Sequence, residues 1–268
     1  MSAVSGAGGG MKAPEGLVAV LKGILGVLVA FAAWELVRQT GFIDKRDLPA
    51  VIDVLGAAFN GLTEGDMSLA LLETLRSWIS GLALATVIGI AAGIALAMLP
   101  GLELATRPIL EFLRPIPSVA LIPVALLVLG IGTSMQLFMI VFAAVWPVLF
   151  STKAGVESID PRYLETGRVL GFGRAELLMR ILLPASLPYI ATGIRTAAAI
   201  ALVLAITVEM LTGRPGIGFY IENVRLNGLT AEMWGGILVT GIFGYLVNAL
   251  FIALERLLLP WSPENRDG

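Results

Sequence analysis

The chain has 268 residues, of which 57% are hydrophobic and 14% are charged, and its formal net charge is −2. Soluble domains have about 45–50% apolar and about 25% charged residues, so this composition excludes an ordinary soluble fold and indicates a protein whose outer faces meet lipid. The absence of cysteine and histidine excludes disulfides, thiolate nucleophiles and the most common metal ligand.

A membrane-crossing helix needs about 20 mainly apolar residues. We therefore predict an all-α membrane protein with about six transmembrane helices inside residues 17–260. Short flexible tails are expected at 1–16 and 261–268. No small-residue cleavage site follows the first apolar run, which predicts an uncleaved span rather than a signal peptide. The predicted spans are, in chain order, 17–37, 72–99, 104–129, 135–150, 187–211 and 234–257.

The second predicted span carries a stripe of small residues with a spacing of four. Such a stripe lets another helix approach closely, although membrane helices are also rich in glycine and alanine for no specific reason. We expect the stripe to be a packing face. Its members are Gly81, Ala85, Gly89, Gly93 and Ala97.

The third predicted span contains four prolines, and each proline removes a backbone donor. Such breaks persist in a membrane only where protein or a water-filled cavity satisfies the freed groups. We therefore expect a broken helix that lies inside the protein, near a pathway. The prolines are Pro108, Pro115, Pro117 and Pro123.

The distribution of basic residues predicts the orientation. One set of loops, which includes both termini and residues 151–186, is richer in lysine and arginine than the other set. Because basic loops stay in the cytoplasm, we expect both termini and the 151–186 loop to be cytoplasmic.

The 151–186 loop interrupts the apolar pattern with signals for a short helix. Asp160 is a good helix cap, and Pro161 fits the first helical position. We predict a helix over 161–170 that stops at Gly171 in the left-handed conformation. Thr166 and Gly167 give this helix a small-residue face for docking into another protein, or else for packing on its own bundle.

A second helix is expected in the same loop, from Arg174 to Leu182. Pro184 and Pro188 follow it. Because proline interrupts helical hydrogen bonding, we expect these two residues to reset the chain before the next span.

The stretch from Glu165 to Gly171, followed by nine residues and then Ile181-Leu182-Leu183-Pro184, resembles the "EAA" loop of ABC importer permeases. That loop reads Glu-Ala-Ala, three residues, Gly, nine residues, Ile, any residue, Leu, Pro. Thr166 and Gly167 replace the two alanines but remain small. The resemblance implies that the ATPase is contacted through Glu165, Thr166, Gly167, Gly171, Phe172, Ile181, Leu183 and Pro184.

This resemblance also implies a fold like that of the methionine-importer permeases, the type I ABC importer fold, with 161–171 as a cytoplasmic coupling helix. It implies a bacterial inner-membrane complex of two permease copies, two ATPase subunits and a periplasmic or lipid-anchored solute-binding protein. ATP and magnesium would bind to the ATPase. This chain has no phosphate-binding loop and is expected to have no catalytic, cofactor or metal site.

Three further strings are similar to the nitrate, sulfonate, taurine and bicarbonate branch of these permeases. They are Arg114-Pro115-Ile116-Pro117, Gly130-Ile131-Gly132 and Gly216-Ile217-Gly218. The branch implies a small anionic solute of the sulfonate, taurine or nitrate class. Importers of pyrimidine precursors and aromatic acids share these strings and remain alternatives, whereas the lack of repeats and histidines disfavours a stand-alone secondary transporter.

Ionisable residues inside spans are expensive and usually face protein or water. Arg195 could meet an anion on its way through, or it could pair with Glu111 or Glu209 and hold the bundle together. The 212–233 segment is either a turn and partial helix near the outer gate, as the resemblance implies, or an ordinary loop. Candidate pathway residues are Glu111, Arg114, Pro117, Thr192, Arg195, Thr196 and Glu209.

Overall fold

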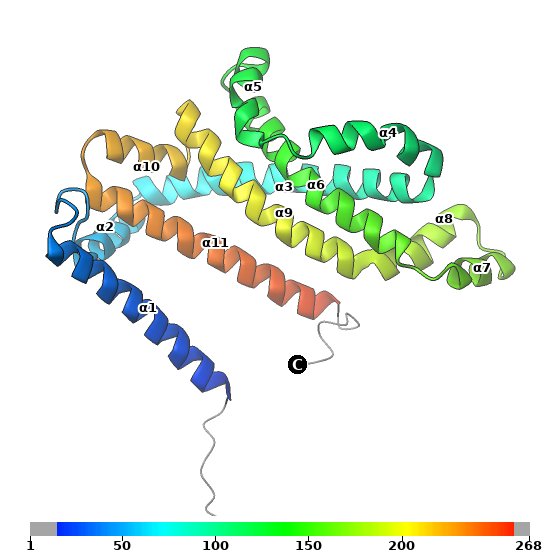
Figure 1. The fold of residues 1–268 in the computed structure, drawn as a ribbon, viewed down its shortest axis with the longest axis horizontal. Helices are drawn as coiled ribbons and strands as arrows, with labels where there is room; N and C mark the ends of the chain where they lie inside the picture. Colours follow the sequence, from blue (N-terminus) through cyan, green and yellow to red (C-terminus); the bar gives the residue numbers. More distant parts are fainter. Residues whose placement is uncertain (1–14, 260–268) are drawn as a thin grey trace, which may run out of the picture.

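The computed structural model describes residues 15–259, with side chains from residue 21 onward. The two predicted tails therefore lie almost wholly outside the described residues. All regular structure between residues 15 and 259 is helical (Figure 1), in the order α1 (Glu15–Thr40), α2 (Val51–Thr63), α3 (Asp66–Met98), α4 (Pro100–Leu113), η1 (Ser118–Leu121), α5 (Ile122–Leu129), α6 (Thr133–Glu157), α7 (Pro161–Val169), α8 (Arg174–Leu177), η2 (Leu178–Leu182), α9 (Leu183–Thr212), α10 (Ile217–Leu226) and α11 (Thr230–Leu258).

Several helices are long and apolar enough to cross a membrane. Four qualify in the described residues, namely α3, α6, the continuous helix Arg174–Thr212 and α11. The pair formed by α4 and Ser118–Leu129 adds a fifth if it is counted as one span. Helix α1, with 26 residues, covers the first predicted span. The predicted all-α membrane fold is confirmed, and the count of six is approximate.

The core lies where α3, α6 and α9 pack against one another. The predicted small-residue stripe on α3 faces α6: a Cβ on Gly89 would lie 2.7 Å from Val148 Cβ, and one on Gly93 would lie 2.6 Å from the Leu149 carbonyl oxygen. Trp78 joins α3 to α9, because its indole Nε1 donates to the Ala198 carbonyl at 2.9 Å. The stripe is a packing face, as predicted.

The third predicted span is broken, and its halves are bent by 87°. The break falls at residues 114–117, where Pro115 and Pro117 withhold donors from the helical pattern. Helix α4, however, has no buried residue. The expectation that this span lies inside the protein is therefore wrong for α4 in the single chain, because α4 lies on its surface, whereas α5 buries Ile122 and Ala125 against α6 and α9.

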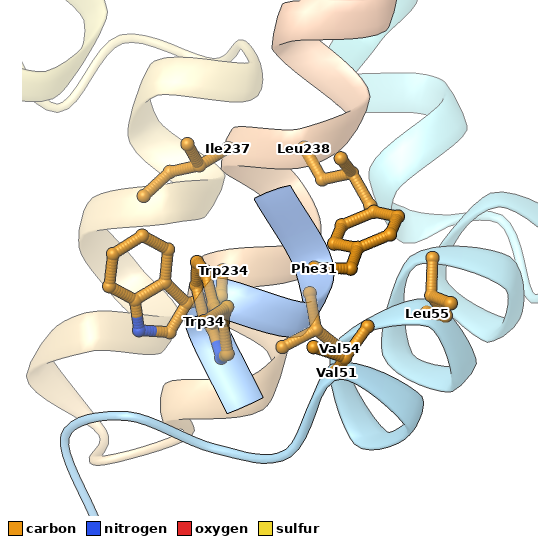
Figure 2. A pocket seen from close by; sticks show the side chains of 8 residues that line it. All are labelled: Phe31, Trp34, Val51, Val54, Leu55, Trp234, Ile237 and Leu238. Atoms are coloured by element: carbon orange, nitrogen blue, oxygen red, sulfur yellow. The ribbon is translucent and has the colours of Figure 1, made fainter. Parts of the chain in front are cut away.

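The 38–71 connection, expected as a loop, contains helix α2, which packs on α11. The rings of Trp34 and Trp234 meet edge to face with centroids 4.6 Å apart. Their indole nitrogens donate to the carbonyls of Pro49 and Asp47. Figure 2 shows the small apolar pocket of about 120 Å³ at this junction, lined by Phe31, Trp34, Val51, Val54, Leu55, Trp234, Ile237 and Leu238.

Helices α7 and α10 lie at opposite ends of the bundle (Figure 1). We call these the α7 end and the α10 end. The long helix Arg174–Thr212 connects them, since it starts just after α7 and finishes just before α10.

Candidate functional site

Helix α7 begins and ends where the sequence predicts. The Asp160 carboxylate accepts a hydrogen bond from the Arg162 backbone N–H at 2.9 Å, and Pro161 occupies the first turn. Gly171 has a φ of 81°, the left-handed conformation that ends a helix without a Cβ penalty. The local signals therefore placed this helix to within a residue.

Gly167 is a packing residue of the loop itself. It is buried, and a Cβ there would lie 2.5 Å from Leu177 Cδ2 and 2.8 Å from Ile181 Cδ1. The hypothesis that Gly167 forms part of a docking face is thus wrong, because α8 and η2 cover it. The absence of a side chain lets α7 fold back onto the start of the long helix.

Other side chains of α7 are exposed, and several of them are apolar. Tyr163 is 65% exposed, Val169 87% and Leu170 67%. Glu165 and Thr166 are exposed beside them. Apolar side chains held open at one end of a bundle are typical of a protein-binding surface. We call Tyr163, Val169 and Leu170 the α7 face.

The second predicted helix of the loop does not stop at the prolines. Helix α8 passes through a π-helical turn, Leu178–Leu182, directly into α9. The expectation that Pro184 and Pro188 reset the chain is wrong, because both lie within the continuous helix. The wider π turn, in which the Leu183 N–H donates to the Leu178 carbonyl, lies just before Pro184. The loop therefore runs into the core as one helix.

The structure brings Glu111 and Arg114 into one charged pocket of about 330 Å³ between α4 and α6. Glu111 pairs with Arg107 at 2.8 Å, and Lys153 pairs with Glu103 at 2.8 Å. Arg114 lies over the Phe150 ring at 4.7 Å. Pro117 immediately precedes η1 and helps to set the bend. Of the predicted pathway residues, Glu111 and Arg114 therefore lie together in one pocket.

Arg195 does not pair with Glu111 or Glu209. Its Nη1 lies 3.1 Å from Glu255 Oε2 on α11, so the predicted partners are wrong, although the predicted bundle-holding ion pair exists. The hydroxyls of Thr192 and Thr196 donate to backbone carbonyls of their own helix. No sequence pattern pointed to Glu255, which stands 60 residues away.

Glu209 is fully buried at the α10 end of α9. Thr74 Oγ1 lies 2.8 Å from Glu209 Oε2, and the Gly218 N–H donates to the same oxygen at 3.1 Å. Gln136 Nε2 donates to Oε1 at 3.1 Å, with Ser77 Oγ more distant at 3.5 Å. The carboxylate therefore joins α3, α6, α9 and α10, and we call these five residues the Glu209 cluster.

The glycines of the 212–233 segment make this cluster possible. A Cβ on Gly216 would overlap the Glu209 carboxylate, and one on Gly218 would overlap the Ile206 carbonyl oxygen. The predicted partial helix is α10, and its Ile217 N–H donates to Thr74 Oγ1 at 2.8 Å.

On the exposed side of α10, hydrogen bonds from Arg225 lower the pKa of the Glu222 carboxyl.

A family model described as the binding-protein-dependent transport system inner membrane component matches residues 69–262. The chain belongs to this family. The nitrate import permease protein NrtB of Synechocystis is 28% identical over 250 residues, 90% of each chain. The bicarbonate transport system permease protein CmpB of the same organism is 31% identical over 90% of this chain and 89% of that one. A putative aliphatic sulfonates transport permease protein, SsuC of Bacillus subtilis, is 28% identical over 90% and 87%.

Solved structures agree with the fold. The inward-facing MetNI methionine ABC transporter has a chain with a TM-score of 0.64 and 19% identity, covering 73% of this chain and 97% of that one. A bacterial alginate ABC transporter gives a TM-score of 0.60 at 16% identity, covering 92% and 95%. The predicted type I importer fold is confirmed, and the chain is a multi-pass transmembrane permease subunit of an ABC importer.

Proposed function

We propose that this chain forms half of the pore of an ATP-driven importer for a small oxyanion, with α7 as its coupling helix. The observation that carries the coupling role is the α7 face. Tyr163, Val169 and Leu170 are held open on a helix that is fixed to the core through Gly167. Such a surface suits a groove on an ATPase subunit, which would bind ATP and magnesium.

The same proposal sets the orientation. The α7 end would lie in the cytoplasm with both termini, as the basic residues of the 151–186 loop favour. The α10 end would then face the periplasm and receive solute from a binding protein. Closure of the ATPase would push α7, and the continuous helix Arg174–Thr212 would carry that displacement toward the Glu209 cluster.

We further propose that two copies of the chain pair to enclose the pore. Apolar side chains on α4 and α5 lie open in the single chain: Phe112 is 70% exposed, Leu127 87% and Val128 72%. A second copy packed there would place the broken span inside the assembly, where its unpaired backbone groups could be satisfied. The charged pocket with Glu111 and Arg114 would then face the pathway.

The solute class rests on the relatives, whose names specify nitrate, bicarbonate and aliphatic sulfonates. These are small oxyanions. We propose the same class for this chain, with pyrimidine precursors or aromatic acids as the alternative. Calorimetric titration of the cognate binding protein with nitrate, bicarbonate, methanesulfonate, orotate and benzoate separates the two. Binding of orotate or benzoate alone would contradict the oxyanion class.

The coupling role is tested in proteoliposomes that contain this chain, its ATPase and its binding protein. Uptake should require ATP. Leu170→Asp should abolish most uptake because it places a charge on the α7 face, whereas Phe42→Asp, at an 89% exposed site in the connection between α1 and α2, should not. Uptake by the permease alone down an ion gradient would contradict the proposal and favour a secondary transporter.

A further inference from the structure

Arg214, two residues after the end of α9, contacts the Glu209 cluster. Its Nε donates to Gln136 Oε1 at 3.1 Å. An arginine can only donate hydrogen bonds, so this contact fixes the orientation of the Gln136 amide. The amide nitrogen must then point to Glu209 and Ser77, as it does at 3.1 and 3.2 Å. The Arg214 guanidinium is therefore held by a chain of hydrogen bonds that runs from Arg214 through the Gln136 amide to Glu209 and Ser77.

The two side chains that position Arg214, Gln136 and Glu209, are held rigidly. Gln136 is 1% exposed, and Glu209, which holds the amide of Gln136, is 0% exposed. Neither side chain has room to rotate, because both are enclosed by α3, α6, α9 and α10. The position of the guanidinium is thus set by buried groups and not by the exposed loop on which Arg214 stands.

Arg214 also differs from the other partly buried arginines. In the part of the chain whose side chains are described, Arg38 and Arg195 are partly buried as well, and each has a glutamate partner, Glu35 at 2.5 Å and Glu255 at 3.1 Å. Arg214 has no carboxylate within 4.0 Å among residues 21–259. Its charge is separated from Glu209 by the Gln136 amide, so it is oriented without being neutralised.

We infer that Arg214 is an anion-contacting residue at the α10 end of the pathway, where it receives a small oxyanion before passage. With Nε held by Gln136, the two terminal nitrogens of the guanidinium keep donors for the paired oxygens of a nitrate, bicarbonate or sulfonate, the fork geometry that favours arginine over lysine. This inference rests on the proposed oxyanion transport and adds the residue that recognises the charge. The sequence pattern alone did not single out Arg214.

The test uses the full importer in proteoliposomes, with ¹⁵N-nitrate, ¹⁴C-bicarbonate and ¹⁴C-methanesulfonate as probes. The readout is the number of anions taken up per ATP hydrolysed, together with copurification of the ATPase as a check on assembly. Arg214→Gln should lower this ratio about 10-fold, the effect of losing one charge-assisted contact. Arg214→Lys, which keeps the charge but loses the fork, should lower it about 3-fold. Arg46→Gln, which removes an exposed cation from the connection between α1 and α2, should match the wild type.

Three results would overturn the inference. The first is an Arg214→Gln complex with the wild-type ratio. The second is failure of the same variant to assemble, which would make Arg214 a structural tie for Gln136. The third is an equal loss of uptake in Arg214→Lys and Arg214→Gln with a matching loss of ATP hydrolysis, so that the ratio stays at the wild-type value, which would assign Arg214 to gating. If the wild type carries none of the three anions, the proposed oxyanion class fails first, and this inference fails with it.

Discussion

At the α7 end of the long helix, short-range contacts and apolar side chains build the structure, whereas at the α10 end polar groups from three helices close around one carboxylate of a fourth. Asp160 caps α7 by accepting a hydrogen bond from the backbone N–H of Arg162, two residues later in the sequence, and Gly167 packs on Leu177. Glu209, by contrast, is reached from Thr74 and Gln136, which stand 135 and 73 residues away in the sequence. The α7 end is built from contacts between neighbours in the sequence, while the α10 end is fixed by long-range geometry.

One continuous helix, Arg174–Thr212, connects the α7 end to the α10 end. The continuous helix Arg174–Thr212 has 39 residues, which corresponds to about 58 Å at 1.5 Å per residue. Its π turn joins the α7 loop firmly to the core, and its other end carries Glu209. A displacement of α7 would therefore be transmitted to the cluster as a shift of one helix. Each end can be broken separately, and the expected effects differ in size and kind.

The largest effect on stability is expected for Glu209→Leu. The change removes the acceptor of Gln136 Nε2 and of the Gly218 N–H. Each buried donor left unpaired costs about 1–3 kcal/mol, so the free energy of unfolding should fall by about 4 kcal/mol in total. The apparent melting temperature in detergent measures this. Glu64→Leu, at an exposed site just after α2, is the control, and equal melting temperatures would contradict the structural role of the cluster.

Gly218→Ala should have the next largest effect. The added methyl group would collide with the Ile206 carbonyl oxygen, a backbone atom that moves only if α9 moves. Overpacking of this kind costs about 1–3 kcal/mol. Gly241→Ala, on α11 with open space around the site, is the matched control and should be neutral or slightly stabilising. A Gly218→Ala variant as stable as this control would show that α10 has room to shift.

The α7 end could be predicted from the sequence because its signals are local. Asp160-Pro161 and Gly171 fix a helix through contacts that span two or three residues, and the helix lies where they placed it. The π turn at Leu178–Leu182 could not be predicted, since two prolines in sequence indicate a break, and only the packed helix shows how the chain absorbs them. The same limit hid α2 within a connection that lacks a full-length apolar run.

The α10 end could be predicted only in part. The intramembrane position of Glu209 marked it as a candidate, but its partners lie on other helices and carry no motif. The partner of Arg195 was missed for the same reason: Glu255 stands near the end of α11, and only Glu111 and Glu209 were considered as partners. Pairings between helices depend on packing that no local pattern encodes.

A stability effect of similar size, together with a large functional effect, is expected for Gly167→Leu. Leu177 Cδ2 and Ile181 Cδ1 already lie within 3 Å of a Cβ at this position, so a bulky side chain should push α7 away from η2. We expect about 1–3 kcal/mol of destabilisation and a loss of most ATP-driven uptake. Gly167→Ala is the control, because two side-chain tips can yield and alanine favours the helix by about 1 kcal/mol. Equal uptake in both variants would show that the α7 position does not matter for coupling.

The smallest effect on stability is expected for Val169→Ser. The side chain is 87% exposed, so the free energy of unfolding should change by less than about 0.5 kcal/mol. If the α7 face docks on the ATPase, the same change should still weaken that association about 10-fold, because an apolar anchor at the centre of an interface contributes about 1–2 kcal/mol. Phe42→Ser, also highly exposed but in the connection between α1 and α2, should alter neither quantity. Biolayer interferometry with the immobilised ATPase, combined with melting curves, measures both. An unchanged affinity for Val169→Ser would remove α7 from the interface and leave the Gly167 contacts as a purely structural feature of the loop.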